Sequence, residues 1–195
     1  MKSEPTNYLA LKNINVRILK EQAAGLVIDI QERLFPLIDK HDEMAANSVI
    51  LIKGLQSMQV PILVTQQYTK GLGTSISPIR ELFEGWEYIE KMAFSCCDDE
   101  GFMGHLKALG KKFIIITGIE SHVCVLQTTL DLLEQGFVPV VVEDCVSSRR
   151  KNDKKHAIHR MRQEGAIIST YESVLFELLR YSGTEEFKAI SKLVK

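Results

Sequence analysis

The sequence predicts an α/β fold in which a mostly parallel sheet of about six strands lies between two layers of helices. Four short segments are near-continuous runs of apolar, largely β-branched residues, which is typical of strands covered on both faces. Segments with apolar residues at helical spacing alternate with these runs, and the joints between them are short. Strands and helices in alternation, joined by right-handed crossovers, give a three-layer α/β/α sandwich. A chain of 195 residues is most simply one domain, 1–195.

The strands are predicted from their composition and length. A fifth strand, 165–172, follows Gly165, and a weaker one, 87–92, surrounds Ile89. The four clearest strands are 24–30, 60–66, 113–119 and 138–145.

The helices are predicted from apolar spacing and from residues that start or stop a helix. Asp98 or Asp99 is suited to an N-cap, and Thr184 starts the last helical segment. Glycine ends three of the segments, as expected where the chain turns left-handed after a helix. The six segments are 42–59, 98–110, 123–136, 152–165, 171–180 and 184–195.

Charge and composition limit the classes of partner. The chain carries 24 Lys and Arg against 25 Asp and Glu, so no overall field favours nucleic acid or an anionic membrane. No apolar run approaches the length of a membrane span. The N-terminal 22 residues lack the apolar region of a secretory signal, and their basic residues leave a mitochondrial presequence open. We expect a cytoplasmic protein, with mitochondrial targeting not excluded.

The four cysteines lack the density and spacing of a disulfide framework or a zinc finger, which favours a reducing compartment. Cys145 ends a strand and is expected in the core. Cys96 and Cys97 are expected to pack near the ligand-binding edge.

Three chemically useful residues follow strands of the predicted sheet, at the edge where ligands bind in such folds. Asp29 lies near the end of the first run, Lys91 closes the weak strand, and Cys124 stands where a helix begins. Each has an ordinary structural interpretation as well. Asp29 could cap a loop, Lys91 could lie on the surface, and Cys124 could be a small buried residue.

Together these residues predict an acyl-transfer site. A carboxylate can accept the proton of a thiol that attacks a carbonyl carbon. The helix N-terminus and a nearby ammonium are expected to lower the pKa of Cys124 and favour its thiolate. Backbone N–H groups in the turn "GIESHVC" are suited to the oxyanion that the attack creates.

Six stretches in order resemble the isochorismatase-like cysteine hydrolase superfamily. They lie between residues 24 and 173, and their sequences are most similar to those of the isochorismatase domain-containing proteins. The stretches are "LVIDIQ", "VTQQYTKGLG", "EKMAFS", "TGIESHVCVLQTTLDLL", "VEDCVSSR" and "RMRQEGAIISTYES".

The resemblance implies an α/β/α fold and an Asp–Lys–Cys triad, whose positions here are Asp29, Lys91 and Cys124. It also implies a cis peptide bond between Ile119 and Glu120, which turns main-chain N–H groups toward the oxyanion. With this resemblance, the nucleophilic role of Cys124 becomes the favoured interpretation.

Two departures from the superfamily bear on the chemistry. Superfamily nicotinamidases carry an Asp and a His after the second strand to hold a metal, whereas this chain reads Gln66, Gln67, Tyr68, Thr69 there. We therefore expect no metal and no cofactor. Enzymes that hydrolyse the vinyl ether of isochorismate lack the cysteine, so Cys124 favours C–N bonds.

Five further residues are candidates for the substrate pocket, because they end or follow the second predicted strand or lie within three positions of Lys91 or Cys124. His122 precedes Cys124 by two positions, and residues two apart on a helix do not face each other, so a contact role is favoured over a catalytic one. The five are Gln66, Gln67, Tyr68, His122 and Phe94. Loops determine which substrate is bound, and their conformation cannot be derived from the sequence. The identity of the substrate is therefore not predicted.

The resulting hypothesis is a cysteine hydrolase that cleaves a small amide, imide or ureido compound through a thioester. The resemblance also implies a homo-oligomer, a dimer or tetramer. One alternative is a catalytically silent interaction protein of the same fold. A second is RNA binding or ribonuclease activity through the basic helix 149–162, but the near-neutral net charge argues against a nucleic-acid partner.

Overall fold

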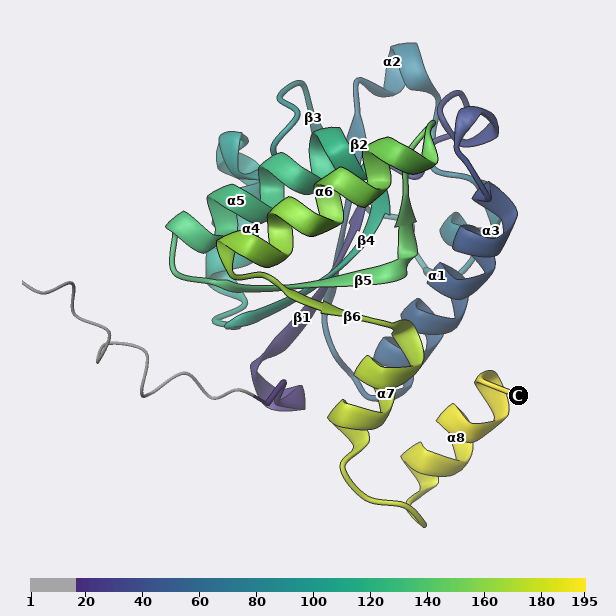
Figure 1. Cartoon of the computed structure of the whole chain (residues 1–195). Coiled ribbons are helices and arrows are strands. Elements are labelled where there is room, and N and C mark those ends of the chain that lie inside the picture. Colours follow the sequence, from purple (N-terminus) through teal and green to yellow (C-terminus); the bar gives the residue numbers. More distant parts are fainter. Residues whose placement is uncertain (1–16) are drawn as a thin grey trace, which may run out of the picture.

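The computed structural model describes residues 17–195. Residues 1–16, which make up most of the segment considered for targeting, lie outside the described residues. Figure 1 shows one twisted sheet with helices on both faces, which confirms the predicted three-layer sandwich. Among the described residues, no helix is both long and apolar enough to cross a bilayer.

The six strands are all parallel, in the order β3-β2-β1-β4-β5-β6. The central strands β1 and β4 are completely buried because helices cover both of their faces, which explains their unbroken apolar runs. The order reverses between β1 and β4, where ligands bind in open α/β sheets. The strands are β1 (Ala23–Ile28), β2 (Ile62–Gln67), β3 (Ile89–Lys91), β4 (Phe113–Ile119), β5 (Val138–Ser147) and β6 (Ile167–Ser169).

Helices cover both faces of the sheet (Figure 1). On one face, apolar side chains of α4, α5 and α6 pack against β1, β4 and β5. On the other face, α1, α7 and α8 form a second core against the same strands. The helices are α4 (Glu100–Ala108), α5 (Leu126–Glu134), α6 (Lys151–Glu164), α1 (His41–Ser57), α7 (Tyr171–Leu179) and α8 (Glu185–Leu193).

Shorter helical turns lie in the connections. Two of them follow β2, and η5 is a π-helical turn between β4 and α5. The short elements are α2 (Thr69–Leu72), α3 (Ser77–Arg80), η2 (Lys20–Gln22), η3 (Phe35–Leu37), η4 (Cys96–Asp98) and η5 (Ser121–Val125).

The C-terminal helix α8 packs on its own subunit. Its Ile190 is fully buried against α1 and α7, and Phe187 and Leu193 pack beside it. Thr184 accepts a hydrogen bond from the N–H of Phe187, so it caps the helix as the sequence predicted. The apolar face of α8 is therefore used within the subunit.

Strand β5 is longer than predicted because it contains a bulge. Ile116 pairs with Val141 and Gly118 with Val146, so one residue of β4 stands opposite four residues of β5. The charged part of "VVVEDCVS" interrupts the apolar run, which is why the sequence placed the end of the strand at Cys145. The strand resumes after the bulge and ends at Ser147.

Candidate active site

Asp29 follows β1 directly and its side chain is fully buried. The residue has a φ of 52°, in the left-handed region, so the chain turns sharply where the strand ends. Its Oδ1 accepts a hydrogen bond from Oγ1 of Thr65 at 2.8 Å, and its Oδ2 lies 2.6 Å from Nζ of Lys91. A buried carboxylate needs such partners.

Lys91 is the last residue of β3, and its ammonium is surrounded by acceptors. Besides Asp29, Nζ donates to Oε1 of Gln67 at 2.8 Å and to the carbonyls of Ala93 and Phe94 at 3.2 Å each. Burial alone would lower the pKa of Lys91, but the negative charge of Asp29 and its hydrogen bond raise it above the ordinary value. Lys91 therefore stays a cation inside the protein.

Cys124 lies in η5, the turn that leads into α5, and is 7% exposed. Burial raises the pKa of its thiol, and the negative charge of Asp29 raises it further, while the charge of Lys91 acts in the opposite sense. The expectation of a lowered pKa was wrong, because burial and the charge of Asp29 outweigh the charge of Lys91. The resting form is a thiol beside a carboxylate.

The turn before Cys124 has the unusual geometry that the resemblance implied. The Ile119–Glu120 peptide bond is cis. The Glu120 carboxylate is almost fully buried. It accepts two hydrogen bonds from Arg149, one from Nε at 2.8 Å and one from the backbone N–H of Arg149 at 3.3 Å. The carbonyl of Glu120 accepts the N–H groups of Val123 and Val125. Arg149 thus holds this turn from the loop that follows β5.

The two glutamines of β2 have different roles, because successive residues of a strand point to opposite faces. Gln67 contacts Lys91 and also donates to the carbonyl of Met92 at 2.7 Å. Gln66 is fully buried and bonds to Thr69, Thr74 and Ser75 in the connection after β2. The amide of Gln66 is thus satisfied within that connection, on the face of β2 opposite Gln67, and its role in a substrate pocket stays a prediction.

The remaining pocket candidates lie around the triad at different distances. Tyr68 is 43% exposed and Phe94 56% exposed, next to the Lys91 hydrogen bonds. His122 turns toward the loop after β5, where its Nδ1 lies 3.0 Å from Oγ of Ser148. None of these three contacts Cys124 through a hydrogen bond in the described residues, so their roles toward a substrate stay predictions.

Two residues were missed as parts of the site. Thr65 orients Asp29 and precedes Gln67 by two positions, so the period of a strand could have placed both on one face. Cys96, expected only to pack near the pocket, lies 3.9 Å from the Thr65 hydroxyl; burial and the charge of Asp29 raise its pKa to about 12. Arg149, which the sequence offered both as part of the basic segment and as a loop residue able to reach the strand ends, lies before α6 and bonds to Glu120.

Residues 23–173 match the isochorismatase domain. The chain belongs to the isochorismatase family. The match covers all six strands and the three residues Asp29, Lys91 and Cys124. The family that the six sequence stretches resembled is thereby confirmed.

Curated relatives of this isochorismatase-family chain are similar over nearly their whole length. Isochorismatase family protein 1B of Dictyostelium discoideum is 39% identical over 184 residues, which is 92% of this chain and 89% of the relative. Isochorismatase domain-containing protein 2A of Mus musculus is 33% identical over 187 residues, 92% of this chain and 85% of the relative.

Solved structures share the fold closely. The MAR1 ribonuclease of Caenorhabditis elegans superposes with a TM-score of 0.87 at 38% identity, covering 92% of each chain. YcaC of Pseudomonas aeruginosa, with hexane-2,5-diol and covalent acrylamide, has a TM-score of 0.86 at 31% identity and covers 92% of each chain. Escherichia coli YcaC, described as an octameric hydrolase of unknown specificity, has a TM-score of 0.87 at 29% identity and covers 93% of this chain and 90% of its own.

The donor groups at the site do not form a metal centre. Within residues 17–195, no group of three or more His, Cys, Asp or Glu side chains is placed to hold a metal ion. The only carboxylate of the triad, Asp29, is bound to Lys91 and Thr65. That the protein works without a metal stays an expectation.

Proposed function

We propose that this member of the isochorismatase family is a cysteine hydrolase that cleaves a C–N bond of a small amide, imide or ureido compound through a thioester intermediate. One observation carries the proposal. The thiol of Cys124 adjoins a fully buried ion pair, Asp29–Lys91, at the carboxyl edge of a parallel sheet. A nucleophile, a proton acceptor and a fixed positive charge are the groups that acyl transfer requires.

In the first half of the reaction, Asp29 takes the proton of Cys124 as the sulfur attacks the substrate carbonyl carbon. A raised thiol pKa suits this sequence, because proton and nucleophile are separated only when the substrate is present. The negative charge that develops on the carbonyl oxygen is met by backbone N–H groups of the turn from Glu120 to Cys124. Collapse of the tetrahedral intermediate breaks the C–N bond, and Asp29 returns the proton to the departing nitrogen.

In the second half, a water molecule cleaves the thioester. Asp29 is again a carboxylate and takes a proton from water as the oxygen attacks the acyl carbon. The C–S bond then breaks, and the proton held by Asp29 returns to the sulfur of Cys124. The products are a carboxylic acid and the amine released in the first half.

Lys91 contacts the Asp29 carboxylate at 2.6 Å and compensates the charge as protons move. It is held for this role by acceptors on two sides, Gln67 and the carbonyls of Ala93 and Phe94. A fixed dipolar and ionic environment stabilises developing charge without reorganisation during the reaction. Lys91 is thus proposed as an electrostatic partner and not as a proton donor.

The relatives support nucleophilic chemistry and an oligomer. Acrylamide bound covalently in Pseudomonas aeruginosa YcaC requires a nucleophile on that protein. Because Escherichia coli YcaC is octameric, we propose that this chain also forms a homo-oligomer. The four free cysteines agree with a reducing compartment, and we propose the cytoplasm.

A screen of small amides, imides and ureido compounds tests the proposal. Wild type is compared with Cys124→Ser and with Cys97→Ser, a matched control whose half-buried thiol lies outside the triad. Hydrolysis that Cys97→Ser retains and Cys124→Ser loses supports the mechanism. Hydrolysis that persists in Cys124→Ser contradicts it. A wild type that hydrolyses nothing in the screen favours the catalytically silent alternative.

Ribonuclease activity is a second candidate, because the Caenorhabditis elegans relative is named a ribonuclease. The outer face of α6 carries exposed basic residues, whereas Lys154 is half-buried and does not belong to that face. RNA cleavage by wild type that is lost in the triple variant Lys151→Gln, Lys155→Gln, Arg160→Gln and weakens with salt favours this candidate. RNA that stays intact at low salt removes it.

A further inference from the structure

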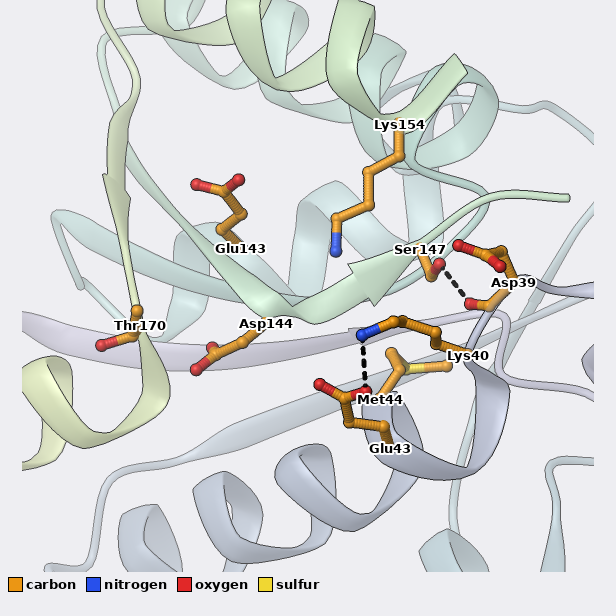
Figure 2. Close-up of a pocket in the computed structure, with 9 residues that line it drawn as sticks. All are labelled: Asp39, Lys40, Glu43, Met44, Glu143, Asp144, Ser147, Lys154 and Thr170. Atoms are coloured by element: carbon orange, nitrogen blue, oxygen red, sulfur yellow. Dashed lines mark hydrogen bonds and ion pairs between the residues drawn. The ribbon is translucent and has the colours of Figure 1, made fainter. Parts of the chain in front are cut away.

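A cavity of about 290 Å³ lies at the carboxyl end of β5, and none of its lining residues belongs to the triad. Figure 2 shows it between the start of α1, the bulged part of β5 and the side of α6. Most of its lining is charged. The residues that matter below are Lys40, Glu43, Glu143, Asp144, Ser147 and Lys154.

The bulge of β5 creates one wall of this cavity. Glu143 and Asp144 belong to the extra residues that β5 inserts opposite a single residue of β4. Asn47 of α1 donates from Nδ2 to the carbonyl of Asp144 at 3.0 Å, so the bulge is held from the helix. Bulges are often found where a strand redirects side chains toward a functional site.

Lys154 extends from α6 toward the space that Lys40, Glu43 and Asp144 surround (Figure 2). Among residues 17–195 it has neither an ion-pair partner nor a hydrogen-bond acceptor within contact distance. Burial lowers its pKa, and the charges of Glu143 and Asp144 oppose this without reversing it. Its ammonium is therefore partly desolvated and lacks a counter-ion in contact.

Asp144 is a partly buried carboxylate that, like the Lys154 ammonium, has no counter-ion in contact within the described part of the chain. Its Oδ1 accepts the N–H of Tyr171 at 2.9 Å, but no cationic group of the described residues lies within 4.0 Å of its carboxylate. Burial raises its pKa. Lys40 does not compensate it, because its ammonium pairs with Glu43 at 3.0 Å. The cavity thus holds an ammonium and a carboxylate apart, each without a partner of opposite charge.

We propose that this cavity binds a small zwitterion, a molecule with one carboxylate and one ammonium group such as a free amino acid. The ligand carboxylate meets Lys154, with Lys40 beside it, and the ligand ammonium meets Asp144. Such a ligand supplies a counter-ion to each of these two half-buried charges in one step. A volume of about 290 Å³ suits a ligand of this size.

The charges of the lining disfavour the simpler ligands. Four carboxylates against two ammonium groups line the cavity, so a dianion such as phosphate is repelled. A simple amine would leave Lys154 without a partner and would add a like charge near it. Only a ligand of both signs satisfies Lys154 and Asp144 together.

Titration of the full-length wild-type protein with linear amino acids, from glycine to 6-aminohexanoate, followed by amide chemical shifts, tests the proposal. Acetate and methylamine at matched ionic strength are the single-charge controls. We expect saturable shifts around Ser147 and Asp144 with at least one amino acid and none with either control. We expect Lys154→Met and Asp144→Asn each to weaken this binding at least about tenfold.

Lys155→Met is the matched control variant, because Lys155 is the exposed neighbour of Lys154 on α6 and should leave the affinity unchanged. If Asp144→Asn fails to fold, Lys154→Met and the single-charge controls still decide. The proposal is overturned if no amino acid in the series binds, if acetate or methylamine binds equally well, or if Lys154→Met binds like wild type. The readout is binding, so the outcome does not depend on whether the chain hydrolyses amides.

Discussion

The Nζ atom of Lys91 lies 2.6 Å from Oδ2 of Asp29, and neither side chain is exposed to solvent. Lys91 ends β3 and Asp29 directly follows β1, and the strand between them, β2, contributes Thr65 and Gln67 to the same cluster. Three neighbouring parallel strands therefore meet at one ion pair. A pair that is so deeply buried is stable only while both charges are present.

Replacement of Lys91 by methionine should destabilise the protein by about 3–5 kcal/mol, because it leaves the Asp29 carboxylate buried without its counter-ion. Urea unfolding followed by circular dichroism measures the change. Lys155→Met is the control, since an exposed lysine outside any ion pair should change the free energy of unfolding by less than about 0.5 kcal/mol.

The single variant Asp29→Asn and the double variant Asp29→Asn with Lys91→Met complete a double-mutant cycle with Lys91→Met. The double variant should be less destabilised than the sum of the two single variants, because it removes both charges at once. Additive single effects would mean that the two residues do not stabilise each other.

Replacement of Thr65 by valine should cost about 1.5–3 kcal/mol, the usual contribution of a hydrogen bond to a charged group. The hydroxyl of Thr65 donates to Oδ1 of Asp29, and both residues are fully buried. Thr129→Val is the matched control: Thr129 is equally buried, but its hydroxyl bonds only to the carbonyl of Val125 in its own helical segment. Equal urea midpoints for the two variants would contradict the role given to Thr65.

Stability should fall as the pH rises above about 9. The folded-state pKa of Cys124 is raised from 9.0 and that of Lys91 from 10.5, so the folded state retains protons that the unfolded state has lost. The stabilisation is fully present below the unfolded values and is lost as the pH climbs through the folded ones. Each group contributes a slope of up to about 1.4 kcal/mol per pH unit. The urea concentration at half-unfolding, measured from neutral to alkaline pH, checks the sign of this dependence. An increase of that concentration as the pH rises beyond about 9 would contradict it.

Alkylation of Cys124 by iodoacetamide should lack a step near neutral pH and should still be accelerating above about pH 9. Burial and Asp29 keep the thiol protonated, so the thiolate becomes available only in alkaline solution. Mass spectrometry of the alkylated peptide gives the rate at each pH, with Cys97, whose pKa burial raises to about 12, as an internal comparison. A plateau reached below pH 7 would show a resting thiolate, and Asp29 would then not be the base.

Much of the fold could be predicted from local pattern, since strands covered on both faces must be apolar throughout. The strand order could not, because nothing in the run 24–30 says that it will lie between 60–66 and 113–119. The bulge in β5 was also invisible. Glu143 and Asp144 look like the end of a strand, and only pairing with β4 shows that the strand resumes.

For the site, the positions of Asp29, Lys91 and Cys124 followed from strand ends and from the family resemblance. The sequence failed where the outcome depends on which face a side chain takes. Gln66 and Gln67 are identical in kind and adjacent, yet only Gln67 contacts Lys91. The thiol pKa was misjudged for a similar reason: the depth of burial of Cys124 is a property of the packed structure and not of its neighbours in sequence.

Replacement of Gly118 by alanine should destabilise the protein by more than about 2 kcal/mol. Gly118 has a φ of 146°, and an added Cβ would lie 2.3 Å from the carbonyl oxygen of Ile28 on the neighbouring strand β1. Backbone cannot move aside there without shifting the next residue, Asp29, so activity should fall together with stability. Gly104→Ala is the matched control. Gly104 lies within α4 with open space around its Cα, and alanine there should stabilise the helix by about 0.5–1 kcal/mol. Opposite shifts of the urea midpoint for the two variants would establish that close approach of β4 to β1 is what requires a glycine, whereas a Gly118→Ala protein as stable as wild type would refute it.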